Sequence, residues 1–196
     1  MAKRVFFSFH YDDVEMFRAN VVRKHDMTKE SRDDAGFFDA SIWESARRRG
    51  DDALKRLIND ALDGTSVTAV LIGSDTFSRR WVRYEILKSL ERGNSLFGVH
   101  INQIRDKDKQ VKPLGPNPLD YLAIKFSDDG MKVTLHEWNT NQWQQYQDLN
   151  GWSFSKPRPQ SDWGQIWQLS KWYHVYNWIS DDGYNNFSKW VEGISQ

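Results

Sequence analysis

Short apolar runs alternate with amphipathic stretches along the first half of the chain. The runs are rich in β-branched and aromatic residues, as in strands buried on both faces, and the stretches between them carry apolar residues at helical spacing. Strands joined by helices of crossover length indicate an α/β fold with a central, mainly parallel sheet flanked by helices. The predicted strands are 5–9, 36–39, 67–73 and 96–101, and the predicted helices are about 12–24, 50–62 and 78–92.

The pattern changes in the second half of the chain. A charged and then proline-rich stretch at 102–120 predicts a long loop. Beyond it, 122–126 has the composition of a fifth strand, and 132–146 alternates between apolar and polar residues as a hairpin does, with its turn at 139–141.

Aromatic residues dominate the C-terminal third. Eight of the ten tryptophans lie at or after Trp138. From about Trp163, apolar residues recur at intervals of three and four, which predicts an amphipathic helix that ends at 182–183, before a short segment near 187–190. The expected division is a domain at 1–130 and an aromatic-rich C-terminal extension at 131–196 that packs on the same domain.

Composition narrows the classes of partner. The 27 basic and 27 acidic side chains cancel, so no overall field attracts the chain to nucleic acid or to an anionic membrane. No apolar stretch approaches the roughly 20 residues of a membrane helix, and the chain has no cysteine and no recognisable secretion signal. We therefore expect a cytoplasmic protein that binds neither nucleic acid nor membrane.

The candidate chemistry lies in the predicted helix that follows the strand 67–73. Trp81 and Glu85 are four residues apart there, which places an aromatic ring beside a carboxylate near the carboxyl end of a strand, where open α/β sheets bind ligands. From spacing alone, Glu85 is better explained as a solvated helix residue, and Trp81 is equally well explained as a core residue. Glycine-rich phosphate-binding motifs are absent, and the five dispersed histidines offer no metal-ligand spacing.

Taken together, the order of these features resembles a Toll/interleukin-1 receptor (TIR) domain, and more closely the TIR-like proteins of the bacterial Thoeris anti-phage system. The likeness rests on the strand 5–9, on Phe38-Asp39 and on the helix with Trp81 and Glu85, and it extends to the C-terminal end through 181–185. It implies a flavodoxin-like TIR fold, with 1–130 as the TIR-like domain.

The resemblance also implies an enzymatic activity. Such domains cleave the nicotinamide–ribose bond of NAD, and Thoeris members are expected to release a cyclised ADP-ribose. That diffusible nucleotide would activate an effector protein of the same defence system. NAD is then the substrate, no separate cofactor or metal is expected, and the family suggests a homo-oligomer.

Site residues follow from the same resemblance. Glu85 occupies the place of the catalytic glutamate. Nicotinamide leaves as a cationic group that needs no general acid, whereas the oxocarbenium-like ribose gains from a nearby carboxylate. The expected NAD-binding residues are Ser8, Phe9, His10, Asp39, Arg80 and Trp81.

Plainer interpretations of these residues stay open. His10 is also explained as a hydrogen-bonded structural histidine, Asp39 as a turn cap, and the arginines around Glu85 as a solvated helix face. Two other functions also compete with the NAD-cleaving enzyme. One is a non-catalytic TIR adaptor that acts by protein–protein interaction, and the other is a nucleoside-processing enzyme that uses the same glutamate.

Overall fold

The computed structural model describes residues 3–11, 13, 18–23 and 40–194. The predicted strand 36–39, the candidate residue Asp39 and much of the predicted helix 12–24 lie outside the described residues. The described part of that helix is α2 (Arg18–Arg23).

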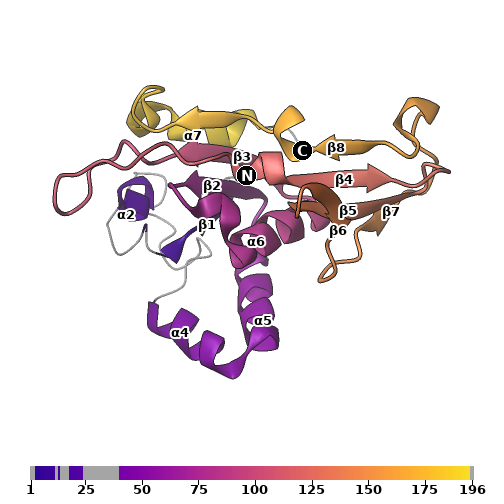
Figure 1. The fold of residues 1–196 in the computed structure, drawn as a ribbon. Helices are drawn as coiled ribbons and strands as arrows, with labels where there is room; N and C mark the ends of the chain where they lie inside the picture. The colour runs from indigo at the N-terminus through magenta and orange to yellow at the C-terminus, as the bar shows by residue number, and fades with distance from the viewer. Residues whose placement is uncertain (1–2, 12, 14–17, 24–39, 195–196) are drawn as a thin grey trace.

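Among the described residues, four parallel strands form the first sheet, in the order β1, β2, β3 and β9. The strands are β1 (Val5–Phe9), β2 (Val67–Ile72), β3 (Ser95–His100) and β9 (Val175–Asn177). The predicted α/β architecture is confirmed, because helices cover both faces of this sheet (Figure 1). Because both faces are covered, the strands are almost unbroken apolar runs, and β2 is buried at every residue.

Helices α4 (Ala40–Arg49) and α5 (Asp51–Leu62) precede β2 in the chain, and α6 (Arg80–Glu91) lies between β2 and β3. Gly50 separates α4 from α5, and its φ of 97° is a conformation that glycine adopts without a steric penalty. Helix α5 runs down from α6 in Figure 1, and α4 turns back from its end. The sequence predicted α5 and α6 but not α4.

A second, antiparallel sheet lies beside the first. Its strand order is β6, β5, β4 and β8, with β7 paired to β5. The strand predicted at 122–126 exists, but it belongs to this sheet. Its strands are β4 (Leu122–Phe126), β5 (Lys132–Asn139), β6 (Gln142–Gln145), β7 (Trp152–Ser153) and β8 (Ile166–Gln168).

The predicted hairpin is confirmed as β5 and β6. Its two turn residues, Thr140 and Asn141, have φ values of 47° and 61°. Two successive residues with positive φ match the turn whose twist suits a tight hairpin. Trp138 and Trp143 pair directly across the strands, with ring centroids 5.2 Å apart.

The predicted amphipathic helix from Trp163 is wrong. This segment instead contains β8, a 3₁₀ turn at Leu169–Lys171 and β9. Each sheet has an edge strand that needs hydrogen-bond partners, and the β-branched and aromatic residues of the segment suit strands. β8 therefore pairs with β4, and β9 pairs with β3.

The short segment predicted near 187–190 lies within α7 (Gly183–Gly193), an 11-residue helix. Asp182, with a φ of 49°, precedes the first turn of α7, so residues 182–183 mark the start of a helix and not the end of one. Phe187 and Trp190 pack beneath the parallel sheet with Trp178 and helix α2. The other face of the sheet carries α6 and the second sheet.

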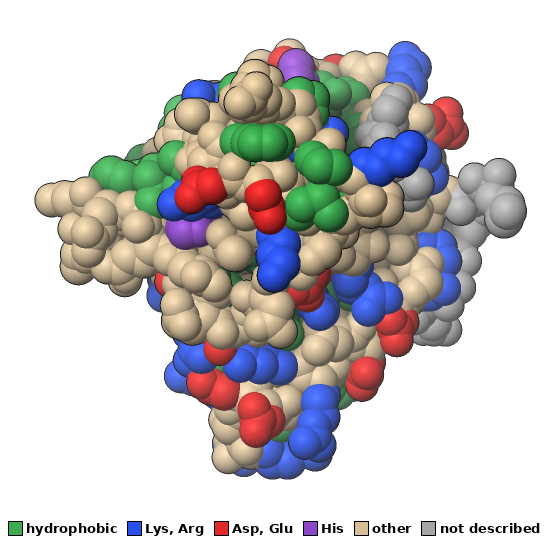
Figure 2. All heavy atoms as spheres, turned by 90° about the vertical axis from the view of Figure 1, so that its right-hand side faces the viewer, with side chains coloured by type: hydrophobic (Ala, Val, Ile, Leu, Met, Phe, Trp, Pro, Cys, Tyr) green, Lys and Arg blue, Asp and Glu red, His purple; other side chains and the backbone are tan. Residues whose placement is uncertain are grey.

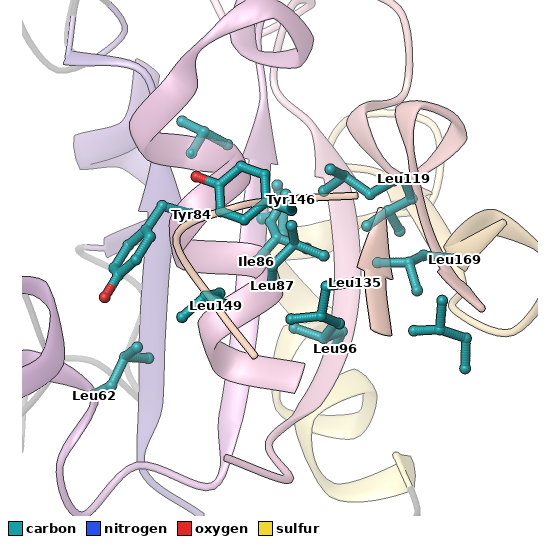
Figure 3. Close-up of a cluster of buried hydrophobic side chains, with 14 of the residues drawn as sticks. Leu62, Tyr84, Ile86, Leu87, Leu96, Leu119, Leu135, Tyr146, Leu149 and Leu169 are labelled. Atoms are coloured by element: carbon teal, nitrogen blue, oxygen red, sulfur yellow. The ribbon is translucent and has the colours of Figure 1, made fainter. Parts of the chain in front are cut away.

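Helix α6 is the element that joins the two sheets. Its residues Tyr84, Ile86 and Leu87 belong to one buried cluster with Leu96 of the parallel sheet and Leu135 of the antiparallel sheet (Figure 3). The charged surface is mixed: basic and acidic side chains are interspersed over the face in Figure 2, as the zero net charge suggests. Among the described helices, none combines the length and apolar character needed to cross a membrane.

The buried Arg18 offers a test of the packing of loop 102–117. Its guanidinium donates to the Ile104 carbonyl at 3.0 Å, the Asp106 carboxylate at 2.8 Å and the Gln110 carbonyl at 2.9 Å, and its side chain is fully buried. Because Arg18→Ala removes these three hydrogen bonds and the packing of a fully buried side chain, we expect a loss of roughly 2–4 kcal/mol in the free energy of unfolding. Thermal denaturation measures this loss.

The matched control is Arg158→Ala, which removes a half-exposed ion pair with Asp162. Its expected cost is below about 1 kcal/mol. Equal losses in the two variants would contradict the role of Arg18.

Candidate active site

A cavity of about 410 Å³ opens at the carboxyl end of β1, against the first two turns of α6. Three segments line it: the end of β1 and the residues after it, the middle of α4, and the start of α6. Its lining residues are Phe7, Phe9, His10, Tyr11, Trp43, Glu44, Arg47, Arg79, Arg80, Trp81, Val82 and Glu85.

Glu85 lies in this cavity on the buried side of α6. Only 6% of the residue is exposed, and Ser8, which is fully buried in β1, donates a hydrogen bond from its Oγ to Glu85 Oε2 at 2.6 Å. Burial raises the pKa of Glu85 to about 8, and the hydrogen bond from Ser8 opposes this rise. The carboxyl group is therefore largely protonated near neutral pH, and a nearby positive charge would favour its anion.

Trp81 forms a half-buried wall of the cavity one helical turn before Glu85. Its ring meets Tyr84 edge-on, with centroids 5.9 Å apart, and the Arg80 guanidinium carbon lies 4.8 Å from its centroid. The ring thus packs on the core and also lines the cavity, so the core and binding interpretations of Trp81 are compatible.

Most of the predicted binding residues meet in this one place. Phe9, His10, Arg80 and Trp81 line the cavity with Glu85, and Ser8 reaches it through its hydrogen bond to Glu85. Asp39 lies outside the described residues. Ser8 donates its hydrogen bond to the carboxyl group of Glu85, and its role in nucleotide binding stays a prediction.

The three arginines around Glu85 have different partners. Arg80 lies 2.7 Å from Asp51 and 3.4 Å from Asp148, so it ties α6 to α5 and to the loop after β6. Arg83 lies 2.8 Å from Glu137 and also donates to the Phe77 carbonyl. Arg79 lines the cavity, and its buried Nε–H has no hydrogen-bond partner among the described residues.

The sequence analysis missed the wall that α4 contributes. Trp43, Glu44 and Arg47 project from α4 into the lining of the cavity. One signal in the sequence was available: Arg47, Arg48 and Arg49 form a basic cluster of the kind that ends a helix. In the described part of the chain, no group of three or more histidine, cysteine, aspartate or glutamate residues is arranged to hold a metal ion.

Comparison with known proteins identifies the family. The family model for the Thoeris protein ThsB, TIR-like domain, matches residues 6–106, which include β1, the cavity and α6. The chain belongs to the Thoeris ThsB family of TIR-like proteins. The resemblance noted in the sequence is thereby confirmed, as is the TIR-like fold.

A curated ThsB relative covers nearly the whole chain. It is 56% identical over 191 residues, which are 97% of this chain and 100% of the relative. That relative is named "Putative cyclic ADP-D-ribose synthase ThsB1" and comes from Bacillus cereus strain MSX-D12. The similarity includes the aromatic C-terminal region, so this region is shared beyond the matched domain.

The protonation state of Glu85 predicts a pH-dependent stability. The unfolded chain releases this proton near pH 4.5, whereas the folded protein holds it up to about pH 8. The contribution of Glu85 to stability therefore falls as the pH rises between these two values. The free energy of unfolding of Glu85→Gln, taken relative to that of the wild type, should therefore rise by about 3 kcal/mol from pH 5 to pH 8.

Thermal unfolding at the two pH values measures this gain. Glu192→Gln, at an exposed position on α7, is the control and should follow the wild type. If Glu85→Gln and the wild type keep a constant difference in Tm across this range, Glu85 is already ionised at pH 5.

Proposed function

We propose that this ThsB-family protein is an NAD-cleaving enzyme that produces a cyclic ADP-ribose. The observation that carries the proposal is the Glu85 carboxyl group, buried at the base of a cavity that Trp43 and Trp81 flank. The name of the 56% identical relative supports the same reaction. A buried glutamate without a cationic partner destabilises a fold even with the hydrogen bond from Ser8, so a functional role explains its presence better than packing does.

The substrate supplies a positive charge beside Glu85, which has no cationic partner among the described residues of the cavity. Nicotinamide in NAD is a cation, and its arrival beside Glu85 favours the carboxylate over the protonated acid, which releases its proton to solvent. The bond between the nicotinamide nitrogen and ribose C1 then breaks, and its electron pair leaves with neutral nicotinamide. The positive charge passes to the ribose, where the Glu85 carboxylate stabilises it.

Cyclisation requires a second group of the same molecule to reach ribose C1 before water does. A ring nitrogen or a hydroxyl group of the remaining ADP-ribose forms the new bond, and a hydroxyl group would release one proton. The apolar part of the lining, Phe7, Phe9, Trp43 and Val82, reduces the access of water to this step. The cyclic product would then diffuse to an effector protein of the same defence system.

Glu85→Gln tests the reaction directly. The amide keeps the shape of the side chain but cannot carry the negative charge, so we expect the rate of NAD consumption to fall about 100-fold or more. Purified protein, alone and mixed with lysate from phage-infected bacteria, is incubated with NAD, and the products are identified by mass spectrometry.

Glu192→Gln should consume NAD at the rate of the wild type. The proposal fails if the wild type leaves NAD intact under both conditions, as a non-catalytic adaptor would, or if Glu85→Gln is fully active. Preference for deoxynucleosides over NAD would instead indicate a nucleoside-processing enzyme.

Ser8 predicts the pH dependence of this activity. Because the working form is the carboxylate, kcat/KM should rise with pH and level off above the pKa of Glu85, about 8. The hydrogen bond from Ser8 lowers that pKa, so Ser8→Ala should shift the rising limb to higher pH. The exposed Ser153→Ala is the control. A drop in rate with an unmoved limb would assign Ser8 to substrate binding instead.

A further inference from the structure

The cavity of the proposed enzyme must hold two negative phosphates as well as a cationic ring. Pyrophosphate binding in proteins relies on arginine side chains and on the free N–H groups at the start of a helix. In the part of the chain that the structure describes, three arginines line the cavity: Arg47, Arg79 and Arg80. Their existing partners determine which of them is available.

Two of the three arginines are already paired. Arg80 bridges Asp51 and Asp148, so its charge is neutralised by two carboxylates from separate elements. Arg47 lies 3.4 Å from Glu44 at the outer edge of the cavity, with 69% of its side chain exposed. A phosphate would have to compete with these carboxylates for either arginine.

Arg79 differs from Arg47 and Arg80 in its partners and in the burial of its guanidinium Nε. No carboxylate in the described part of the chain pairs with it, and its Nε–H is buried without a hydrogen-bond partner there. A buried donor without a partner destabilises the fold, and a phosphate oxygen would satisfy it. Arg79 also stands at the N-cap position of α6, a 12-residue helix whose cap has no side-chain hydrogen bond.

The start of α6 adds to this site. Arg80, Trp81 and Val82 form the first turn after Arg79, and all three line the cavity. The N-terminal ends of helices carry partial positive charge and unpaired N–H groups. Glu85 follows Arg79 by six residues, roughly 9 Å along a helix axis, so the phosphates and the reacting ribose would lie side by side along α6.

We propose that Arg79, and not Arg80, binds the pyrophosphate of the dinucleotide and so positions its ribose at Glu85. This role rests on the proposed function for the identity of the substrate. Arg80 instead has a structural role, since it holds α5, α6 and the loop around Asp148 together.

The test compares Arg79→Gln with Arg80→Gln in the full-length protein. The probe is ADP-ribose, which contains the pyrophosphate but no nicotinamide bond to cleave, and adenosine is the ligand without phosphate. Calorimetric titration gives each Kd, and thermal denaturation gives each Tm.

We expect Arg79→Gln to weaken ADP-ribose binding about tenfold or more and to leave adenosine binding within about twofold. Arg79→Lys should recover part of the loss, because lysine keeps the charge but not the planar fork. The Tm of Arg79→Gln should equal or exceed that of the wild type. Arg80→Gln should show the reverse, with a lower Tm and a Kd for ADP-ribose changed by less than about threefold.

Three results would overturn the assignment: an unchanged Kd for ADP-ribose in Arg79→Gln, an equal loss for adenosine, or a larger loss in Arg80→Gln than in Arg79→Gln. The assay also separates the two proposals. Binding of ADP-ribose that depends on Arg79 in a protein that never consumes NAD would reject the reaction and keep the site. NAD consumption at the wild-type rate in Arg79→Gln would reject the site and keep the reaction.

Discussion

The packing of α6 between two sheets is the constraint on which the rest of this structure depends. Val82, Tyr84, Ile86 and Leu87 are all buried, in one cluster that also contains residues of both sheets. The polar residues that remain are held by partners from other elements, such as Glu137 for Arg83. A carboxyl group on this helix at position 85 has only the cavity to face, and it meets Ser8 there.

The stability of the fold and the chemistry of the cavity both depend on the protonation state of Glu85. A buried carboxyl group that stays protonated lowers the stability of the fold progressively above pH 4.5, but by less than the same group ionised without a partner would. The fold therefore tolerates Glu85 while the cavity is empty of cations. A group with a pKa near the working pH is also suited to change its charge when a charged substrate arrives.

Sequence patterns predicted the parallel sheet and α6 because long apolar runs and helical spacing are local properties. The rule that ligands bind at the carboxyl ends of parallel strands also indicated Trp81 and Glu85 as site residues, and the resemblance to TIR domains added Phe9 and His10 to the same site. The segment after Trp163 was misassigned because it forms edge strands of both sheets. Pairing with strands that are distant in the sequence leaves no trace in local periodicity. The sequence also could not predict that, among the residues the structure describes, Arg80 is paired with carboxylates and Arg79 is not, since one partner of Arg80 is Asp148, which lies far along the chain.

The place of β9 at the edge of the parallel sheet has a consequence for how the chain folds. β3 ends at His100, but its neighbour in the sheet begins at Val175, so the ribosome must add some 75 residues before that hydrogen-bonding edge is covered. Pairings of such long range make folding slow and leave an unpaired edge exposed in the meantime. A nascent ThsB-family chain is therefore most vulnerable to edge-to-edge aggregation during the synthesis of its second sheet.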